Sequence, residues 1–212
     1  MSEMRTETMT VNMGPQHPST HGVLRLVLEL DGETVVNAEP TVGYLHTGIE
    51  KTIEQKKWQQ AIPLVERMDY LGAQSNSLSF CLSVEKLLGV EMPDRVTYIR
   101  VLIAELQRLN SHLVWLATHA MEIGAVSVMM YAFREREQLL NLNEMIAGFR
   151  LFPSYIRVGG LREDLPRGYS KAVKAFLDKM PAALDNYELM LTKNQVWLKR
   201  TKGVGRLSKA DT

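Results

Sequence analysis

A loop rich in proline and glycine carries two histidines that are candidates for proton exchange. The stretch GPQHPSTHG (residues 14–22) sets His17 and His21 among residues that forbid a regular helix or a central strand. A histidine on an ordered loop can reach a ligand and exchange a proton near neutral pH. The alternative is an ordinary turn that the prolines shape. The residues alone leave both interpretations open.

A second polar cluster lies in ERMDY (residues 66–70). It combines two carboxylates, the Arg67 guanidinium and the Tyr70 phenol within little more than one turn of an expected, mostly apolar helix. Such a cluster is costly to bury unless its members are paired or functional. A tyrosine hydroxyl can donate to a carbonyl or quinone oxygen. The other interpretation is a helix end or a salt-bridge corner, which the residue types by themselves favour.

Other chemistry finds little support in the sequence. His112 and His119 are seven residues apart on one helix face, but neither a Glu-x-x-His pair nor HExxH accompanies them. Hydrogen-bonded histidines at helix contacts are therefore the favoured interpretation. The single cysteine, Cys81, excludes an intrachain disulfide and a Cys-based zinc or iron–sulfur site. No phosphate-binding glycine motif is present. We expect the chain itself to bind no metal and no nucleotide.

Composition describes an ordinary globular protein. The 212 residues are 45% hydrophobic, and 25 Lys and Arg against 24 Asp and Glu leave a net charge of +1. This balance argues against a disordered chain and against nucleic acid as the main partner. The N-terminal residues lack a signal-peptide pattern, and no apolar run is long enough to cross a membrane. The single cysteine is typical of a reducing compartment, so we expect a cytoplasmic location, with any membrane association made through a partner.

The order of expected elements predicts an α+β fold. The runs 23–30 and 33–38 flank Asp31-Gly32, which is typical of an antiparallel hairpin. Helical spacing of apolar residues follows, with Pro181 disturbing the last helix. The expected helices span residues 49–58, 64–88, 93–124, 125–150 and 167–192, with an ordered loop at 155–161. Long helices with short connections are typical of a bundle.

Four regions follow from this pattern. They are a flexible tail at 1–10, a β-rich element with the histidine loop at 11–47, a helical bundle at 48–198, and a basic tail at 199–212. The fold class is therefore a small antiparallel β-hairpin element followed by a mainly helical bundle.

Several segments, in this order, resemble the D-type subunit of bacterial NADH-quinone oxidoreductase, the 49-kDa-type subunit of respiratory complex I. The resemblance covers about residues 11–205, and members of the family are considerably longer, so we expect this chain to be their N-terminal part, as a fragment or one piece of a split subunit. The segments are GPQHPSTHGVLRLVLEL (14–30), EPTVGYLHTGIEKTIE (39–54), ERMDYLG (66–72), SVEKLLG (83–89), IRVLIAELQRLNSHL (99–113), AFREREQLL (132–140) and YIRVGGLREDLP (155–166).

The resemblance implies a fold similar to the large subunit of nickel–iron hydrogenases. In those enzymes cysteine pairs hold the metal centre. Asp69 and Gly72 stand here where cysteines would be, and Cys81 is alone. A nickel centre therefore lacks its ligands, and the family uses the corresponding cavity as a pocket for the quinone headgroup.

Individual residues carry further implications of the resemblance. His21 matches the loop histidine that hydrogen-bonds quinone, and Tyr70 matches the tyrosine on the other side of the pocket. The family aspartate that pairs with that histidine aligns with Glu122. Arg67 matches an arginine beside the terminal iron–sulfur cluster of the neighbouring subunit. Two further cluster-side positions depart from the family: an arginine is Thr47 here, and a histidine is Phe152.

The resemblance thus implies a quinone-site subunit of a proton-pumping oxidoreductase, inactive as an isolated chain. Its implied partners are the subunit that holds the terminal iron–sulfur cluster, the 30-kDa-type (C-type) subunit and the membrane subunit at the quinone channel. The implied location is peripheral, on the cytoplasmic face of the bacterial inner membrane. Two alternatives remain: a non-catalytic helical scaffold that docks an iron–sulfur subunit, and a hydrogenase-like relative, against which the absent cysteines argue.

Overall fold

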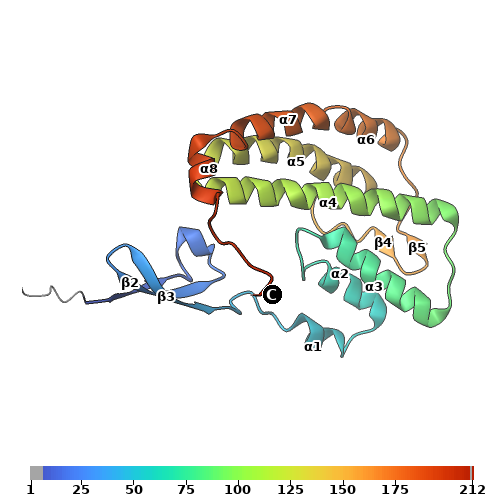
Figure 1. The fold of residues 1–212 in the computed structure, drawn as a ribbon. Coiled ribbons are helices and arrows are strands. Elements are labelled where there is room, and N and C mark those ends of the chain that lie inside the picture. Colours follow the sequence, from blue (N-terminus) through green and yellow to red (C-terminus); the bar gives the residue numbers. More distant parts are fainter. Residues whose placement is uncertain (1–6, 211) are drawn as a thin grey trace, which may run out of the picture. The chain divides into compact units, whose positions relative to one another are not determined.

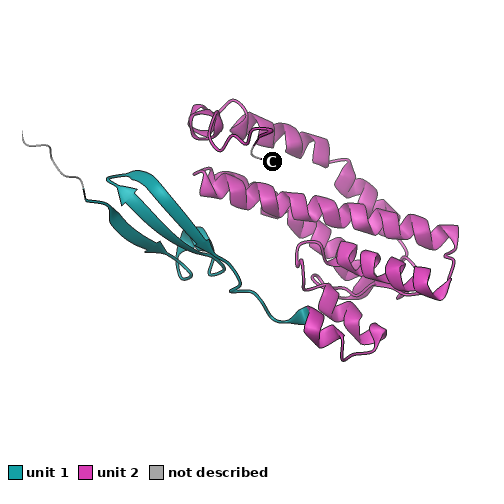
Figure 2. Ribbon diagram, turned by 60° about the horizontal axis from the view of Figure 1, so that its bottom comes forward, with its two compact units in different colours: residues 1–49 teal, residues 50–212 magenta. Residues whose placement is uncertain are grey.

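The computed structural model describes residues 7–210 and 212, which divide into two compact units. Unit 1 ends at Ile49 and unit 2 begins at Glu50 (Figure 2). The division lies two residues beyond the predicted end of the β-rich element at residue 47. Of the predicted N-terminal tail, residues 1–6 lie outside the described part of the chain.

Unit 1 is built on a three-stranded antiparallel sheet of order β1-β2-β3. The strands are β1 (Met9–Met13), β2 (Arg25–Asp31) and β3 (Thr34–Thr41). The hairpin predicted around Asp31-Gly32 is confirmed: Asp31 pairs with Thr34, and Gly32 adopts the left-handed φ of +60° that the tight turn needs. Strand β1 begins inside the predicted tail, because Met9 pairs with Leu30.

Unit 2 is helical apart from one small hairpin, and the α+β class is confirmed. Helices α4 and α5 form a long antiparallel pair, with α6 and α7 packed along α5, and α3 and the hairpin packed on the side of α4 (Figure 1). The elements are α1 (Ile49–Ile53), α2 (Trp58–Val65), α3 (Ala73–Leu88), α4 (Asp94–Glu122), α5 (Val126–Ala147), β4 (Ile156–Arg157), β5 (Gly160–Leu161), α6 (Tyr169–Leu177), α7 (Met180–Leu191) and α8 (Gln195–Thr201).

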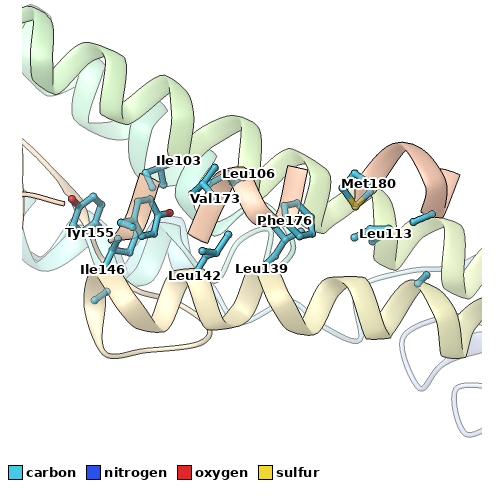
Figure 3. Packing of buried hydrophobic residues seen from close by; sticks show 14 of the residues in the cluster. Ile103, Leu106, Leu113, Leu139, Leu142, Ile146, Tyr155, Val173, Phe176 and Met180 are labelled. Carbon is cyan, nitrogen blue, oxygen red and sulfur yellow. The ribbon is translucent and has the colours of Figure 1, made fainter. Parts of the chain in front are cut away.

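The core of unit 2 runs along the α4–α5 interface and under α6. Apolar residues recur at helical spacing on facing sides of these helices, and burial of each large side chain contributes about 1.5–3 kcal/mol. Figure 3 shows this packing. The labelled side chains are Ile103, Leu106 and Leu113 of α4, Leu139, Leu142 and Ile146 of α5, and Val173, Phe176, Met180 and Tyr155 from the elements around them.

Three predicted helix bounds are wrong. The helix expected over 64–88 breaks at 66–72, because the Asp69 carboxylate accepts from the backbone N–H of Leu71 (3.0 Å) and so stabilises a turn in place of the helix. The helix expected over 49–58 ends at Ile53, and the one over 167–192 is two helices, with Pro181 in the first turn of α7.

The predicted C-terminal region also differs. Helix α8 spans Gln195–Thr201, past the expected start of the basic tail at Lys199. The Asn194 side chain caps α8 by accepting from two backbone N–H groups, and Arg200 donates to the Ile123 carbonyl at the end of α4. These contacts give a short, polar segment a defined place.

Candidate functional site

The histidine loop of unit 1 is held by one buried hydroxyl. Thr20 is 2% exposed, and its Oγ1 lies 3.1 Å from the Pro15 carbonyl and 3.0 Å from the His17 carbonyl. Gly14 is required at the loop entrance, because a Cβ there would lie 2.2 Å from the Leu24 carbonyl oxygen and 2.6 Å from Thr20 Oγ1. These contacts support the conformation of the loop.

The two histidines of this loop have different settings. His17 Nδ1 accepts from the backbone N–H of Ser19 (3.2 Å), so His17 shapes the turn. His21 closes the short helix Pro18–Thr20 in the left-handed region (φ 52°) with an exposed side chain. A non-glycine residue in that region is strained and needs support from its surroundings. Both side chains are exposed, so the two histidines differ in the hydrogen bond that His17 accepts and in the left-handed backbone of His21.

Tyr70 lies in the turn between α2 and α3, and not on a helix as the sequence suggested. Its side chain is 55% exposed. The backbone around it is fixed on both sides: Asn76 Nδ2 donates to the Asp69 carbonyl (3.2 Å) and to the Val65 carbonyl (3.0 Å), and Gln107 of α4 donates to the Leu71 carbonyl. An exposed phenol on a fixed backbone suits recognition of a ligand oxygen, because little conformational freedom is lost on binding.

Gly72 fits closely against this turn. A Cβ at position 72 would lie 2.5 Å from Asp69 Oδ2, so the carboxylate occupies the space of a side chain there. Asp69 and Gly72 are the two positions at which the resemblance places hydrogenase cysteines. Within the described residues, no group of three or more His, Cys, Asp or Glu side chains is arranged to hold a metal ion.

Arg67 stands in the same turn and packs on an aromatic ring. Its guanidinium carbon lies 4.7 Å from the centroid of the Phe152 ring, and Nη1 donates to the Pro63 carbonyl. Phe152 stands where many family members have a histidine. Its ring thus contacts Arg67, the positive group that the resemblance places beside the partner's cluster. The sequence indicated neither contact.

Glu122 is the last residue of α4 and is exposed. It lies fifteen residues beyond Gln107, the residue bonded to the Tyr70 turn, which corresponds to roughly 22 Å along the helix. The Tyr70 turn therefore contacts the middle of α4, whereas Glu122 lies at the C-terminal end of that helix. The pairing of Glu122 with His21 involves a residue of the other unit and stays a prediction, as does a role for Thr47.

The candidate metal histidines have aromatic contacts. His119 stacks on Trp115 with ring centroids 5.5 Å apart and meets the edge of Trp197 at 6.3 Å. Both His112 and His119 are exposed. His119 thus lies at a contact between α4 and α8 through its ring, and the hydrogen-bonded role expected of His112 and His119 stays a prediction.

Two buried carboxylates contact the segment that follows α5: the sequence placed Glu66 in the ERMDY cluster without indicating its partners, and it did not indicate Glu85. Glu66 is fully buried and accepts from Ser154 N (2.7 Å), Ser154 Oγ (2.8 Å) and Ser77 Oγ (3.1 Å). Burial raises the pKa of its carboxyl above the ordinary value, although the serine hydrogen bonds oppose that rise. The sequence held one signal for this buried polar site: Ser77 is spaced by four and eight residues from Cys81 and Glu85, so all three lie on the buried face of α3.

The second buried carboxylate, Glu85, has a charged partner. Arg100 of α4 binds it with two hydrogen bonds of 2.7 and 2.8 Å, and both side chains are under 5% exposed. Arg100 also donates to the Arg157 and Gly160 carbonyls, and Gly159 N donates to Glu85 (2.8 Å). The hydrogen bonds from Arg100 hold the pKa of Glu85 below its usual range. An arginine on the buried stripe of α4 was the sequence signal for this pair.

No helix in the described part of the chain has both the length and the apolar character needed to span a membrane. The α4 run that holds His112 and His119 belongs to the bundle.

Known proteins resemble this chain in sequence. Residues 122–212 match the family described as "Respiratory-chain NADH dehydrogenase, 49 Kd subunit". The chain is 59% identical to a D-type subunit (form 2) of NADH-quinone oxidoreductase from Roseiflexus sp. over 95% of its residues, and 61% identical to the corresponding protein of Chloroflexus aurantiacus over the same share. The D-type subunit of Citrifermentans bemidjiense is 57% identical over 98% of the chain.

The coverage is unequal on the two sides of these alignments. The matches take in 48%, 49% and 54% of those three relatives, so the chain spans about half the length of the curated relatives it matches. The resemblance identified from the sequence motifs is confirmed.

Proposed function

The chain is a relative of the D-type subunit of NADH-quinone oxidoreductase, a complex I subunit, over 95% of its residues, and from that premise we propose that it forms part of a quinone-reduction site. The single observation that supports this role best is Tyr70. Its phenol is 55% exposed, whereas the backbone on either side is tied to α2, α3 and α4. That arrangement presents one hydroxyl donor to a ligand at low entropic cost.

Quinone reduction to quinol takes up two electrons and two protons. The chain offers a single cysteine and no cofactor motif, so the electrons come from an iron–sulfur cluster of the neighbouring subunit. In this proposal Tyr70 donates a hydrogen bond and a proton to one quinone oxygen and His21 does the same for the other; Tyr70 then regains its proton from solvent water at its exposed phenol. The role of Glu122 in orienting His21 and returning its proton is taken from the family resemblance alone. The complex is a membrane-associated translocase, and this chain lies peripherally on its cytoplasmic face.

The partners in this proposal follow from the same chemistry. The subunit with the terminal cluster meets the Arg67 side, where the guanidinium rests on Phe152. The 30-kDa-type subunit and the membrane subunit at the quinone channel complete the assembly.

A second candidate function is a scaffold without catalytic residues. It is favoured by large apolar side chains that remain exposed on the helices of unit 2, among them Leu87 (87%), Tyr98 (77%) and Met130 (69%). Exposed apolar surface of this kind is typical of protein interfaces. The scaffold role and the quinone role differ in whether Tyr70 matters to turnover.

The test uses the assembled complex with Tyr70→Phe, which removes only the hydroxyl. Loss of one neutral hydrogen bond is worth about 0.5–1.5 kcal/mol, so we expect quinone reduction to fall several-fold. NADH oxidation with ferricyanide, which draws electrons upstream, should stay unchanged. Unchanged quinone reduction would support the scaffold, and loss of both activities would indicate misassembly. Tyr131→Phe, an exposed tyrosine on α5, is the matched control.

A further inference from the structure

The segment that carries Phe152 has an unusual backbone. Phe152 (φ 52°) and Ser154 (φ 43°) both adopt left-handed conformations, and buried Pro153 lies between them. L-residues rarely take this conformation, and it persists only where neighbouring groups hold it. The side chain that supplies such a hold is Glu66.

Glu66 holds Ser154 through both of its oxygens. Oε1 accepts from the Ser154 backbone N–H at 2.7 Å, and Oε2 accepts from the Ser154 hydroxyl at 2.8 Å. Ser77 of α3 donates to Oε1 at 3.1 Å and so fixes the carboxylate from behind. The two bonds to Ser154 span 88 residues of sequence, so they join the start of the Tyr70 turn to the segment after α5.

Two residues from Ser154, the Phe152 ring lies under the Arg67 guanidinium at 4.7 Å. Arg67 directly follows Glu66 in the chain. Glu66 and Arg67 thus contact the same short segment, one through Ser154 and one through Phe152. Fixing Ser154 fixes the ring on which the guanidinium rests.

We propose that Glu66 is a positioning residue for Arg67: by holding Ser154, it keeps the Phe152 ring beneath the guanidinium and so fixes the place of that positive charge. This inference rests on the proposed function, in which Arg67 lies on the side that receives electrons. It adds a residue that does not touch the substrate. A cation on an aromatic face at an exposed site gains about two- to fivefold in population, which sets the size of the expected effect.

The first experiment observes Arg67 directly, by NMR of the full chain with labelled arginine. A guanidinium over a ring face should show an upfield Nε–H resonance. Phe152→Leu removes the ring, so the resonance that shifts in this variant is assigned to Arg67. Glu66→Ala and Ser154→Ala should move the resonance toward the free-arginine position. Glu66→Gln should largely retain it, because the amide oxygen still accepts from Ser154 N and the amide N–H can donate to the Ser154 hydroxyl, whereas Ser154→Ala loses the second of these contacts. Glu105→Ala, an exposed carboxylate paired with Arg108, is the matched control.

The second experiment measures turnover in the assembled complex. Glu66→Ala should lower quinone-linked electron transfer about two- to fivefold, with ferricyanide reduction unchanged, and Glu66→Gln should restore most of it. In the Phe152→Leu background, Glu66→Ala should add little, because both changes act through the same contact. Fully additive losses would overturn the proposal, since a merely structural role predicts independent effects.

The two outcomes separate this inference from the function on which it rests. If Arg67→Ala slows quinone reduction while Glu66→Ala and Ser154→Ala leave the Arg67 resonance in place, the positioning role is wrong and the function stands. If the resonance moves as expected but Arg67→Ala leaves quinone reduction unchanged, the function is wrong at this residue. Failure of Glu66→Ala to fold leaves Ser154→Ala as the deciding variant.

Discussion

The two ends of residues 152–161 are held by buried carboxylates of different kinds. At the hairpin end, Glu85 is paired with Arg100 and further tied to the Gly159 N–H. At the Phe152 end, Glu66 is fully buried and accepts only from the neutral donors of Ser77 and Ser154, within the described residues. Their pKa shifts have opposite directions for this reason: Glu85 is lowered by Arg100, and Glu66 is raised by burial.

The difference suggests two roles: Glu85 anchors the hairpin end of the segment, and Glu66 supports the end that contacts the candidate site. Loss of either partner of a buried ion pair is strongly destabilising, because the remaining charge is buried with neither a counter-charge nor water around it. A carboxylate held by neutral donors tolerates a neutral amide of the same shape much better. The end that carries the candidate functional side chain is therefore the more adjustable of the two.

The largest effect on stability is expected from removing the ion pair at the hairpin end. Arg100→Met leaves Glu85 buried without its cation, which should lower the free energy of unfolding by about 3–5 kcal/mol. Urea denaturation of the full chain measures the change. The double variant Glu85→Leu with Arg100→Met should recover much of the loss, since no unpaired charge remains. A change below about 1 kcal/mol in the single variant would show that the anchor is not buried in solution.

The next effect concerns Cys81, whose thiol donates to the Ile156 carbonyl (3.7 Å) between the two ends. Burial raises its pKa to about 11 from an ordinary 9.0. At pH 8 the shift alone should slow alkylation about 100-fold relative to the unfolded chain, because the thiolate is the nucleophile. Iodoacetamide labelling followed by mass spectrometry measures the rate. Arg100→Met should nevertheless speed labelling more than Glu66→Gln does, because loss of the buried cation destabilises the fold and opens the core around the thiol, although Arg100 itself lowers the thiol pKa. Equal rates in the two variants would remove the distinction between the ends.

A smaller effect is the pH dependence of the two glutamine variants. Glu66 has a raised pKa in the folded state, so its stabilising contribution is full below about pH 4.5 and is lost as pH rises through the folded value. Wild type should therefore lose stability relative to Glu66→Gln above that pH. Glu85 has a lowered pKa, so its contribution is present above about pH 4.5 and lost as pH falls. Wild type should lose stability relative to Glu85→Gln on acidification. Slopes of the same sign, measured by urea denaturation across pH, would contradict the comparison.

The smallest effect on stability is expected from exposed ion pairs, which provide a reference for the buried pair. Lys174 and Asp178 form an i,i+4 pair at 2.8 Å with both side chains mostly exposed. Asp178→Asn should lower the free energy of unfolding by about 0.3–0.5 kcal/mol, and salt should reduce the difference. Parallel melts at low and high salt measure it. A loss comparable to that of Arg100→Met would mean that burial does not govern these ion pairs.

Much of the fold followed from periodicity and turn residues. The Asp31-Gly32 hairpin and the α4–α5 pair were predicted because apolar spacing and punctuating glycines are local signals. The break at 66–72 was missed, because it depends on a side-chain bond from Asp69 and on a contact from Gln107, which is 36 residues from its partner Leu71 in the chain. Local patterns do not record such contacts.

The candidate site was predictable only in part. Motif resemblance selected His21, Tyr70, Arg67 and Glu122 but could not place them. The roles of Glu66, Ser154 and Phe152 depend on contacts across 88 residues, which no spacing rule reveals. His17 and His21 looked alike in sequence and differ only in backbone conformation and partner.

The central claim is that Tyr70 and His21 contact quinone, and photolabelling tests it most directly. A photoreactive quinone analogue, irradiated in the assembled complex and analysed by peptide mapping, should label the segments around Tyr70 and around His21. Excess unlabelled quinone should suppress both labels, and Tyr70→Phe should weaken the first several-fold. Labelling confined to other segments, or labelling that excess quinone does not suppress, would contradict the account.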